Sequence, residues 1–254
     1  MILIFLRLII FLLFTLVLLP FQLVIVYLIK KNTYIIPYFF HNLCRRIFGI
    51  KIKICGKVSG NFPVLFISNH ASYLDILILG SLFKTSFVAK REVEKWPLFG
   101  ILAKLQNTIF IDRKISSLKI QESKIIKHLN KKKNLVIFPE GTSSDGNKVL
   151  PFKSSLFNIF EKNLNAKISI QTITIIYKKI NGIDMNRIDR KNITWHSDMD
   201  LVTNFFSVLK KLTIQVEVIF DDKFLPPKEH NRKKIALHCW KKINYNLRNS
   251  LCRK

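Results

Sequence analysis

The longest uninterrupted pattern in the chain is an apolar stretch near its amino terminus. Residues 8–29 contain no charged side chain, and about 20 apolar residues suffice to cross a bilayer. A signal peptide is the alternative, but the stretch is long, contains Pro20 and Gln22, and lacks a small-residue cleavage site. We therefore predict an N-terminal membrane-embedded helix over residues 2–29, within an anchor of residues 1–31. Because Pro20 could kink this helix or divide it into a re-entrant pair, spanning and re-entrant arrangements are both open.

After the anchor, the chain alternates between helix-like and strand-like patterns. Residues 35–48 place aromatic residues beside two arginines, as in amphipathic helices that lie on membranes, and residues 49–55 have isoleucine at every second position, as in a strand. Further strands are predicted at residues 64–67, 135–138, 168–177 and 213–220, and further helices from residue 72 and at residues 93–106, 117–131 and 229–250. Residues 178–200 are polar and predict an extended loop anchored by Trp195. This alternation favours an α/β fold, a mixed sheet flanked by helices.

The charge of the chain narrows its possible partners. With 42 Lys and Arg against 16 Asp and Glu, the formal net charge is +26, and such a field attracts anionic surfaces. The basic residues are spread along the chain without a nucleic-acid-binding motif, so no specific nucleic-acid partner is predicted. Membrane lipids with anionic headgroups fit better, because each Lys or Arg near the surface adds about 1 kcal/mol of attraction. A lysine- and isoleucine-rich codon bias is a simpler source of much of this charge.

The first basic residues predict an orientation in the membrane. Lys30, Lys31, Arg45 and Arg46 follow the apolar stretch, and only Arg7 and the terminal amine precede it. The positive-inside bias therefore places the body of the protein on the cytoplasmic side of the inner (plasma) membrane. The four cysteines agree, since they form no C-x-x-C pair and predict neither a zinc framework nor a disulfide scaffold.

A histidine and a carboxylate five residues apart are the first candidates for catalysis. His70 and Asp75 follow the predicted buried strand at residues 64–67. On a continuous helix, positions i and i+5 are separated by roughly 140°, so these side chains can meet only if the chain turns between them. A carboxylate on one imidazole nitrogen leaves the other free to take a proton, which makes a general base for a hydroxyl nucleophile. The alternative is a capping Asp and a structural His.

Two later blocks of sequence bear on the role of His70 and Asp75. Residues 110–113 read Phe-Ile-Asp-Arg, and residues 138–142, directly after a predicted strand, read Phe-Pro-Glu-Gly-Thr. With residues 69–75, they resemble the N-H-x4-D, F-x-x-R and F-P-E-G-T motifs of the lysophosphatidic acid acyltransferase family, in the same order and at similar spacing. The resemblance extends from about Pro63 to Tyr177. It implies four segments, which are the anchor 1–31, an interfacial helix and first strand 32–62, the catalytic core 63–178, and a C-terminal completion with a basic helix 179–254.

The resemblance implies roles for the later blocks. Arg113 offers a planar fork of donors for an acceptor phosphate. Gly141 permits close backbone approach, so that amides there and the Thr142 hydroxyl can hold a phosphate or the developing oxyanion. Glu140 is placed in the acceptor-binding block, holding Arg113 or an acceptor hydroxyl. The simpler alternatives are a surface ion pair of Arg113 with Asp112 and an ordinary tight turn at Gly141.

The chain departs from the family pattern at two positions. Ser143 follows the F-P-E-G-T block where an arginine is common, and Thr172 stands where a later strand usually carries proline. The proline is dispensable in a strand, but the missing arginine removes a cation from the expected phosphate site. Lys90 and Lys153 are the candidates to replace that charge, although either is equally consistent with a solvated surface lysine.

The resemblance implies a membrane-bound acyltransferase. It would move a fatty acyl group from acyl-CoA or acyl carrier protein to the sn-2 hydroxyl of 1-acyl-glycerol-3-phosphate, forming phosphatidic acid, with no metal and no cofactor besides the acyl donor. The Ser143 departure motivates a second lysolipid acceptor without phosphate, a lyso-aminolipid such as lyso-ornithine lipid. A hypothesis of another class is a non-catalytic, basic membrane-binding protein with a decayed site, against which the intact His70, Asp75 and Arg113 argue.

Overall fold

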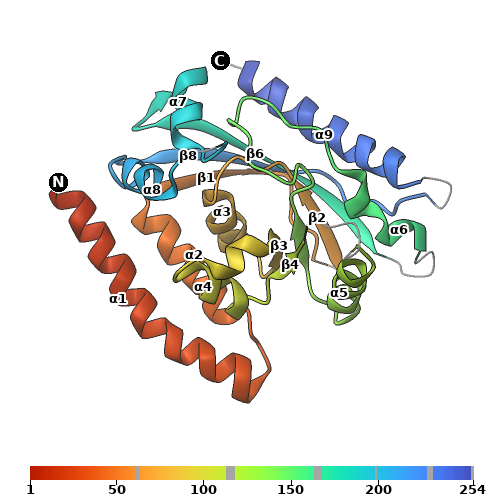
Figure 1. Cartoon of the computed structure of the whole chain (residues 1–254). Helices are drawn as coiled ribbons and strands as arrows, with labels where there is room; N and C mark the ends of the chain where they lie inside the picture. Colours follow the sequence, from red (N-terminus) through yellow and green to blue (C-terminus); the bar gives the residue numbers. More distant parts are fainter. Residues whose placement is uncertain (61–62, 113–117, 163–167, 198, 228–230, 253–254) are drawn as a thin grey trace.

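A computed structural model describes residues 1–60, 63–112, 118–162, 168–197, 199–227 and 231–252. Within these residues an eight-stranded sheet forms the centre of the molecule, with helices on both faces (Figure 1). The strands are β1 (Ile50–Cys55), β2 (Val64–Ser68), β3 (Ser86–Lys90), β4 (Ile109–Ile111), β5 (Leu135–Ile137), β6 (Ser169–Ile180), β7 (Ile183–Asp184) and β8 (Ile214–Phe220). The helices are α1 (Ile2–Val24), α2 (Ile35–Ile47), α3 (Leu74–Leu82), α4 (Phe99–Leu105), α5 (Leu118–Asn130), α6 (Ile159–Lys162), α7 (Arg187–Ile193), α8 (Leu201–Leu209) and α9 (Arg232–Cys252).

The order of the strands brings the motif blocks to one edge of the sheet. The order is β1-β8-β6-β2-β5-β3-β4, with β7 paired to β6. Strands β6, β2, β5, β3 and β4 run parallel, whereas β8 is antiparallel to β6, so the predicted mixed sheet flanked by helices is confirmed. Because β2, β3, β4 and β5 are parallel, the loops after their carboxyl ends lie along the same edge, where ligands bind in open α/β sheets.

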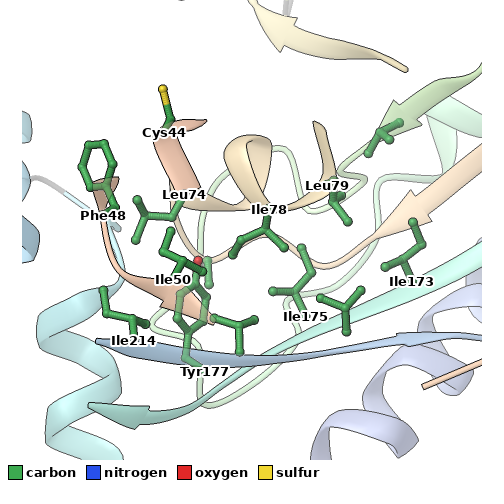
Figure 2. Close-up of a cluster of buried hydrophobic side chains, with 14 of the residues drawn as sticks. Cys44, Phe48, Ile50, Leu74, Ile78, Leu79, Ile173, Ile175, Tyr177 and Ile214 are labelled. Atoms are coloured by element: carbon green, nitrogen blue, oxygen red, sulfur yellow. The ribbon is translucent and has the colours of Figure 1, made fainter. Parts of the chain in front are cut away.

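A layer of buried apolar side chains packs against each face of the sheet. Strand β6 points Ile173, Ile175 and Tyr177 to the side of α3, in one buried cluster with Leu74, Ile78 and Leu79 (Figure 2). Its alternate positions contribute to the second layer, which α5 and α9 cover on the opposite face. Residues 170–177 of β6 are buried on both faces. The buried polar side chains among them, Gln171, Thr172 and Thr174, are each hydrogen-bonded.

Helix α1 lies along the domain instead of projecting from it (Figure 1). It is continuous through Pro20 and extends as a π-helical turn over Ile25–Ile29; this unit is long and apolar enough to cross a membrane, with a mean hydropathy of 3.1 in its most apolar stretch. The Arg7 guanidinium donates to three backbone carbonyls at the end of α8, at 2.5–3.0 Å. The Gln22 amide donates to the carbonyls of Thr33 and Leu105, at 2.9 and 2.8 Å. These contacts tie the helix to the body at points about 22 Å apart.

Several elements differ from the sequence-based expectations. The predicted loop 178–200 is instead the end of β6, the short strand β7 and helix α7, whose capping box joins Asn186 and Asp189. Trp195 does anchor the following turn, because its ring packs 5.7 Å from that of Trp96 and its backbone N–H donates to the carbonyl of Ala71. The predicted helix 93–106 is divided at Trp96-Pro97 into a 3-10 turn and α4, since proline cannot donate within a helix.

Strands β3 and β4 and helices α6 and α8 had no sequence prediction. Helix α2 confirms the predicted helix at residues 35–48, but it buries Pro37, His41 and Cys44 against the domain. Its exposed side keeps Tyr38 and Phe39.

Candidate active site

The loop between β2 and α3 carries His70 and is fixed from both sides. Strand β2 ends at Ser68, and α3 begins at Leu74, so the chain turns between His70 and Asp75 as the spacing requires. The buried Asn69 amide bonds both the N–H and the carbonyl of Ile175, at 2.8 and 2.9 Å, which pins the end of β2 to β6. This attachment leaves little freedom to the residue that follows.

The predicted contact between His70 and Asp75 is present. Asp75 Oδ2 lies 2.9 Å from His70 Nδ1 and also accepts the backbone N–H groups of Ala71 and Ser72, at 2.7 and 3.0 Å. An ionised carboxylate only accepts hydrogen bonds, so Nδ1 carries the hydrogen and Nε2 remains available to take a proton. The His70 side chain is 19% exposed and stacks on Phe138, with ring centroids 4.2 Å apart.

Tyr177 joins this pair and was not predicted. Its hydroxyl donates to Asp75 Oδ1 at 2.6 Å, and the Tyr177 side chain is 1% exposed. Burial, followed by the charge of Asp75, raises the pKa of Tyr177 well above its ordinary value, so the phenol stays protonated and donates. The only sequence signal was its place in the alternation of Ile173 and Ile175, which sets it on the side of the sheet that α3 covers.

Glu140 braces the site from the neighbouring loop. It is 3% exposed, and its two oxygens accept the backbone N–H groups of His70 and Leu150, each at 2.7 Å. Burial raises the pKa of Glu140 to about 8; the two amides oppose that rise, and the charge of Asp75 adds to it. Glu140 Oε1 therefore holds the loop of His70 and Oε2 holds the backbone at Leu150; the predicted role of Glu140 in acceptor binding stays a prediction.

The remaining residues of the block line the turn after β5. Gly141 has a φ of +68°, which favours glycine, and the flexible end of the Lys153 side chain approaches it so closely that a methyl group there would lie 2.6 Å from Nζ. Lys153 thus brings a cation to this turn, as the sequence analysis considered. The Thr142 side chain is exposed, and Lys90 ends β3 at the same edge of the sheet.

The other predicted phosphate ligand, Arg113, lies outside the described residues. Its neighbour Asp112 pairs with Arg91 at 2.5 Å. After the turn, the backbone N–H of Ser144 donates to the His70 carbonyl at 2.8 Å, which joins the next loop to the site. Beside that loop lies an open hollow of about 300 Å³, lined by Asp145, Asn147, Lys148, Arg187, Ile188 and Lys191.

The geometry supplies a base for a hydroxyl nucleophile. A weakly acidic alcohol needs a proton acceptor as it attacks a carbonyl carbon. The His70 side chain is partly exposed, and its Nε2 atom makes no hydrogen bond to the described residues. Asp75, held by its four donors, orients the imidazole and stabilises the imidazolium that forms. Across the described residues, no group of three or more His, Cys, Asp or Glu side chains is placed to hold a metal ion.

Comparison with known proteins shows which family the chain resembles. A model described as Acyltransferase matches residues 50–176. The lyso-ornithine lipid O-acyltransferase of Brucella abortus is 36% identical over 224 residues, which are 86% of this chain and 84% of that protein. The 1-acyl-sn-glycerol-3-phosphate acyltransferase of Neisseria gonorrhoeae is 30% identical over 159 residues, which are 61% of this chain and 59% of that protein.

The fold comparison agrees. The crystal structure of the 1-acyl-sn-glycerophosphate (LPA) acyltransferase of Thermotoga maritima superimposes with a TM-score of 0.59 at 18% identity, covering 98% of this chain and 99% of that one. The family model spans half of the chain, and the Brucella relative spans most of it. The chain therefore belongs to the lysophosphatidic acid acyltransferase family and is an acyltransferase of lysolipids.

Proposed function

We propose that this protein transfers a fatty acyl group from acyl-CoA or acyl carrier protein to the free hydroxyl of a lyso-aminolipid of the lyso-ornithine lipid type. The observation that carries the proposal is the extent of the likeness, since the Brucella lyso-ornithine lipid O-acyltransferase aligns with 86% of the chain, whereas the Neisseria 1-acyl-sn-glycerol-3-phosphate acyltransferase aligns with 61%. This reverses the order of the two acceptors that the sequence motifs suggested.

The proposed reaction uses the two nitrogens of His70 differently. Nε2 takes the proton of the acceptor hydroxyl as its oxygen attacks the thioester carbonyl, while Nδ1–H stays on Asp75. The tetrahedral intermediate then collapses, the carbon–sulfur bond breaks, and the imidazolium returns the proton to the leaving thiolate. The products are an ester and a free thiol. The Gly141 turn, with Lys153 beside it, is the candidate site for the oxyanion or the headgroup.

The charges near the His70 loop support an acceptor with both signs of charge. The hollow carries Lys148, Arg187 and Lys191 together with the carboxylate of Asp145. An ornithine headgroup has a carboxylate for the cations and an amine for Asp145. A phosphomonoester would meet Asp145 as a like charge, and it would lack the arginine that Ser143 replaces.

The acceptor can be identified with purified protein, an acyl donor and two lysolipids. We expect acylation of lyso-ornithine lipid to exceed that of lysophosphatidic acid. Ser143→Arg should lower kcat/KM for lyso-ornithine lipid roughly tenfold, corresponding to about 1.4 kcal/mol, because it adds a cation beside the headgroup amine. Ser143→Ala is the matched control and should change neither acceptor. Robust use of lysophosphatidic acid, with none of lyso-ornithine lipid, would restore the phosphorylated acceptor.

We also propose that α1 lies in the cytoplasmic leaflet without crossing the bilayer. Arg7 and Gln22 fasten both halves of the helix to the body, and its other sides expose large apolar residues such as Phe5, Leu13 and Leu16. A helix that left the body to cross the membrane would lose at least one of these polar attachments. The basic residues after α1 support the cytoplasmic side for the body.

This arrangement predicts that both termini lie on the same side of the membrane. The protein should stay in membranes after high-salt and carbonate washes, since apolar contact, and not charge, holds it. Epitope tags ahead of Met1 and after Lys254 should both resist protease in intact spheroplasts and both be cleaved in inverted vesicles. Cleavage of the amino-terminal tag alone in spheroplasts would indicate a spanning helix, and release by salt alone would indicate surface adsorption.

A further inference from the structure

We propose that Tyr177 is a positioning residue of the active site, whose hydroxyl sets the proton affinity of His70 through Asp75. The inference rests on the proposed role of His70 as the base. It adds a third member to the pair that the motifs identify, and this member lies in β6, five residues after Thr172.

The contact is built from three separate elements. Tyr177 lies in β6, Asp75 in the first turn of α3, and His70 in the loop after β2. Figure 2 shows the Tyr177 ring rising from β6 toward the helix that carries Leu74 and Ile78. Asp75 is fully buried, and among the described residues Tyr177 is the one donor to its Oδ1 atom, whereas Oδ2 has three donors.

Because the two oxygens of Asp75 have different donors, the position of the carboxylate and the electrostatic effect of Tyr177 on His70 can be separated. The backbone N–H groups of Ala71 and Ser72 hold Oδ2 without help from Tyr177, so loss of the phenol hydroxyl leaves the carboxylate in place. What it removes is the positive end of an O–H dipole, buried close to the imidazole. That dipole favours a carboxylate and opposes an imidazolium, so its removal makes His70 easier to protonate.

Other titratable groups face the same site and must be controlled. Glu140, on the loop after β5, has its pKa raised to about 8 by burial, so it changes charge in the range of interest. Tyr73, in the loop before α3, is partly exposed, but its hydroxyl is buried; burial raises the pKa of Tyr73, and the hydroxyl has no hydrogen-bond partner in the described structure. Since Glu140 is present in each variant to be compared, its titration is common to all of them.

The test compares two hydroxyl deletions in the full-length, membrane-reconstituted protein. Tyr177→Phe should move the midpoint of the acidic limb of the kcat/KM–pH profile upward by roughly 0.5–1 pH unit, a loss of about three- to tenfold below the midpoint, with recovery at high pH. Tyr73→Phe removes a neighbouring buried hydroxyl that does not touch Asp75, and its profile should overlay that of the wild type. An equal loss at every pH, or an equal shift in both variants, would overturn the proposal.

A second measurement separates this inference from the proposed reaction. The rate at which diethylpyrocarbonate modifies His70, followed by peptide mass spectrometry, reports protonation of the imidazole without turnover. An upward shift in this rate profile for Tyr177→Phe supports the role of Tyr177 even if the base for acyl transfer proves to lie elsewhere; an unchanged profile rejects it. If Tyr177→Phe does not accumulate, 3-fluorotyrosine at position 177, a stronger donor of similar size, should shift the same profile downward, and no shift would reject the role.

Discussion

Acyl transfer should be lost when His70 is replaced by alanine, with kcat/KM falling roughly 10²–10⁴-fold, as is typical when a positioned general base is removed. The hydroxyl would then face the thioester without His70 to take its proton, and the neighbouring carboxylates of Glu140 and Asp75 are buried and already accept backbone N–H groups. Turnover should be measured at matched amounts of membrane-bound protein.

Folding should survive this substitution. The bond from the His70 backbone N–H to Glu140 does not involve the imidazole, and the side chain packs mainly on Phe138. His128→Ala is a matched control, since His128 is a part-buried histidine on α5 that bonds the Asn134 carbonyl before β5, at the other end of that strand. We expect the control to keep its activity. Near-normal turnover in His70→Ala would mean that the base lies elsewhere.

The pair of His70 and Asp75 could be predicted because its evidence is local. A buried strand followed by a five-residue spacing requires a turn at the carboxyl end of the strand, and that turn is observed. The contact of Tyr177 with Asp75 could not be predicted in the same way, since it joins residues 102 apart and depends on β6 lying next to β2. The strand order is a property of the whole sheet, and it cannot be predicted from a local pattern in the sequence.

The same reasoning applies to the contacts of Glu140 and to helix α7. The motif identified Glu140 as important, but its partners are backbone N–H groups, which leave no mark on the sequence. Asn186 and Asp189 do mark the start of a helix, because an Asn followed three residues later by an acid satisfies free N–H groups at a helix start. The low apolar content of residues 178–200 concealed this signal.

Single polar residues in helix α1 indicate where this apolar helix attaches to the domain. Its composition predicted an apolar helix, but composition could not say how the helix sits on the domain. Arg7 and Gln22 are the polar side chains that reach the body, and each bonds backbone carbonyls far away in the sequence. An unexpected polar residue in such a stretch therefore marks a point of attachment, because burying it without partners would be costly.

Asp75→Asn should have the second-largest effect, lowering kcat/KM roughly 10–10³-fold, because a partner charge within hydrogen-bond distance favours the imidazolium by about 1–3 pKa units. The direction in which the pH profile shifts follows from the lost charge. A neutral neighbour makes His70 harder to protonate, so the acidic limb of the kcat/KM–pH profile should move to lower pH. Activity should stay low at high pH, since the imidazolium formed during proton transfer is less stabilised.

The donors around Asp75 decide how an asparagine would sit there. With its oxygen at the Oδ2 position, the amide accepts from His70, Ala71 and Ser72 and points its NH₂ group at Tyr177, whose hydroxyl can turn to accept. The flipped amide would set its NH₂ group against three donors. The tautomer of His70 should therefore persist, and the loss in Asp75→Asn should come from the missing charge.

In Asp75→Asn/Tyr177→Phe the amide NH₂ has no acceptor, and burying it unpaired should cost stability beyond the sum of the two single variants. Thermal unfolding of the four proteins measures this coupling, and their pH profiles measure the charge effect separately. If Asp75→Asn alone is as inactive as His70→Ala and its acidic limb does not move, the imidazole has changed tautomer, and the backbone N–H groups of Ala71 and Ser72 do not fix the amide as the geometry requires.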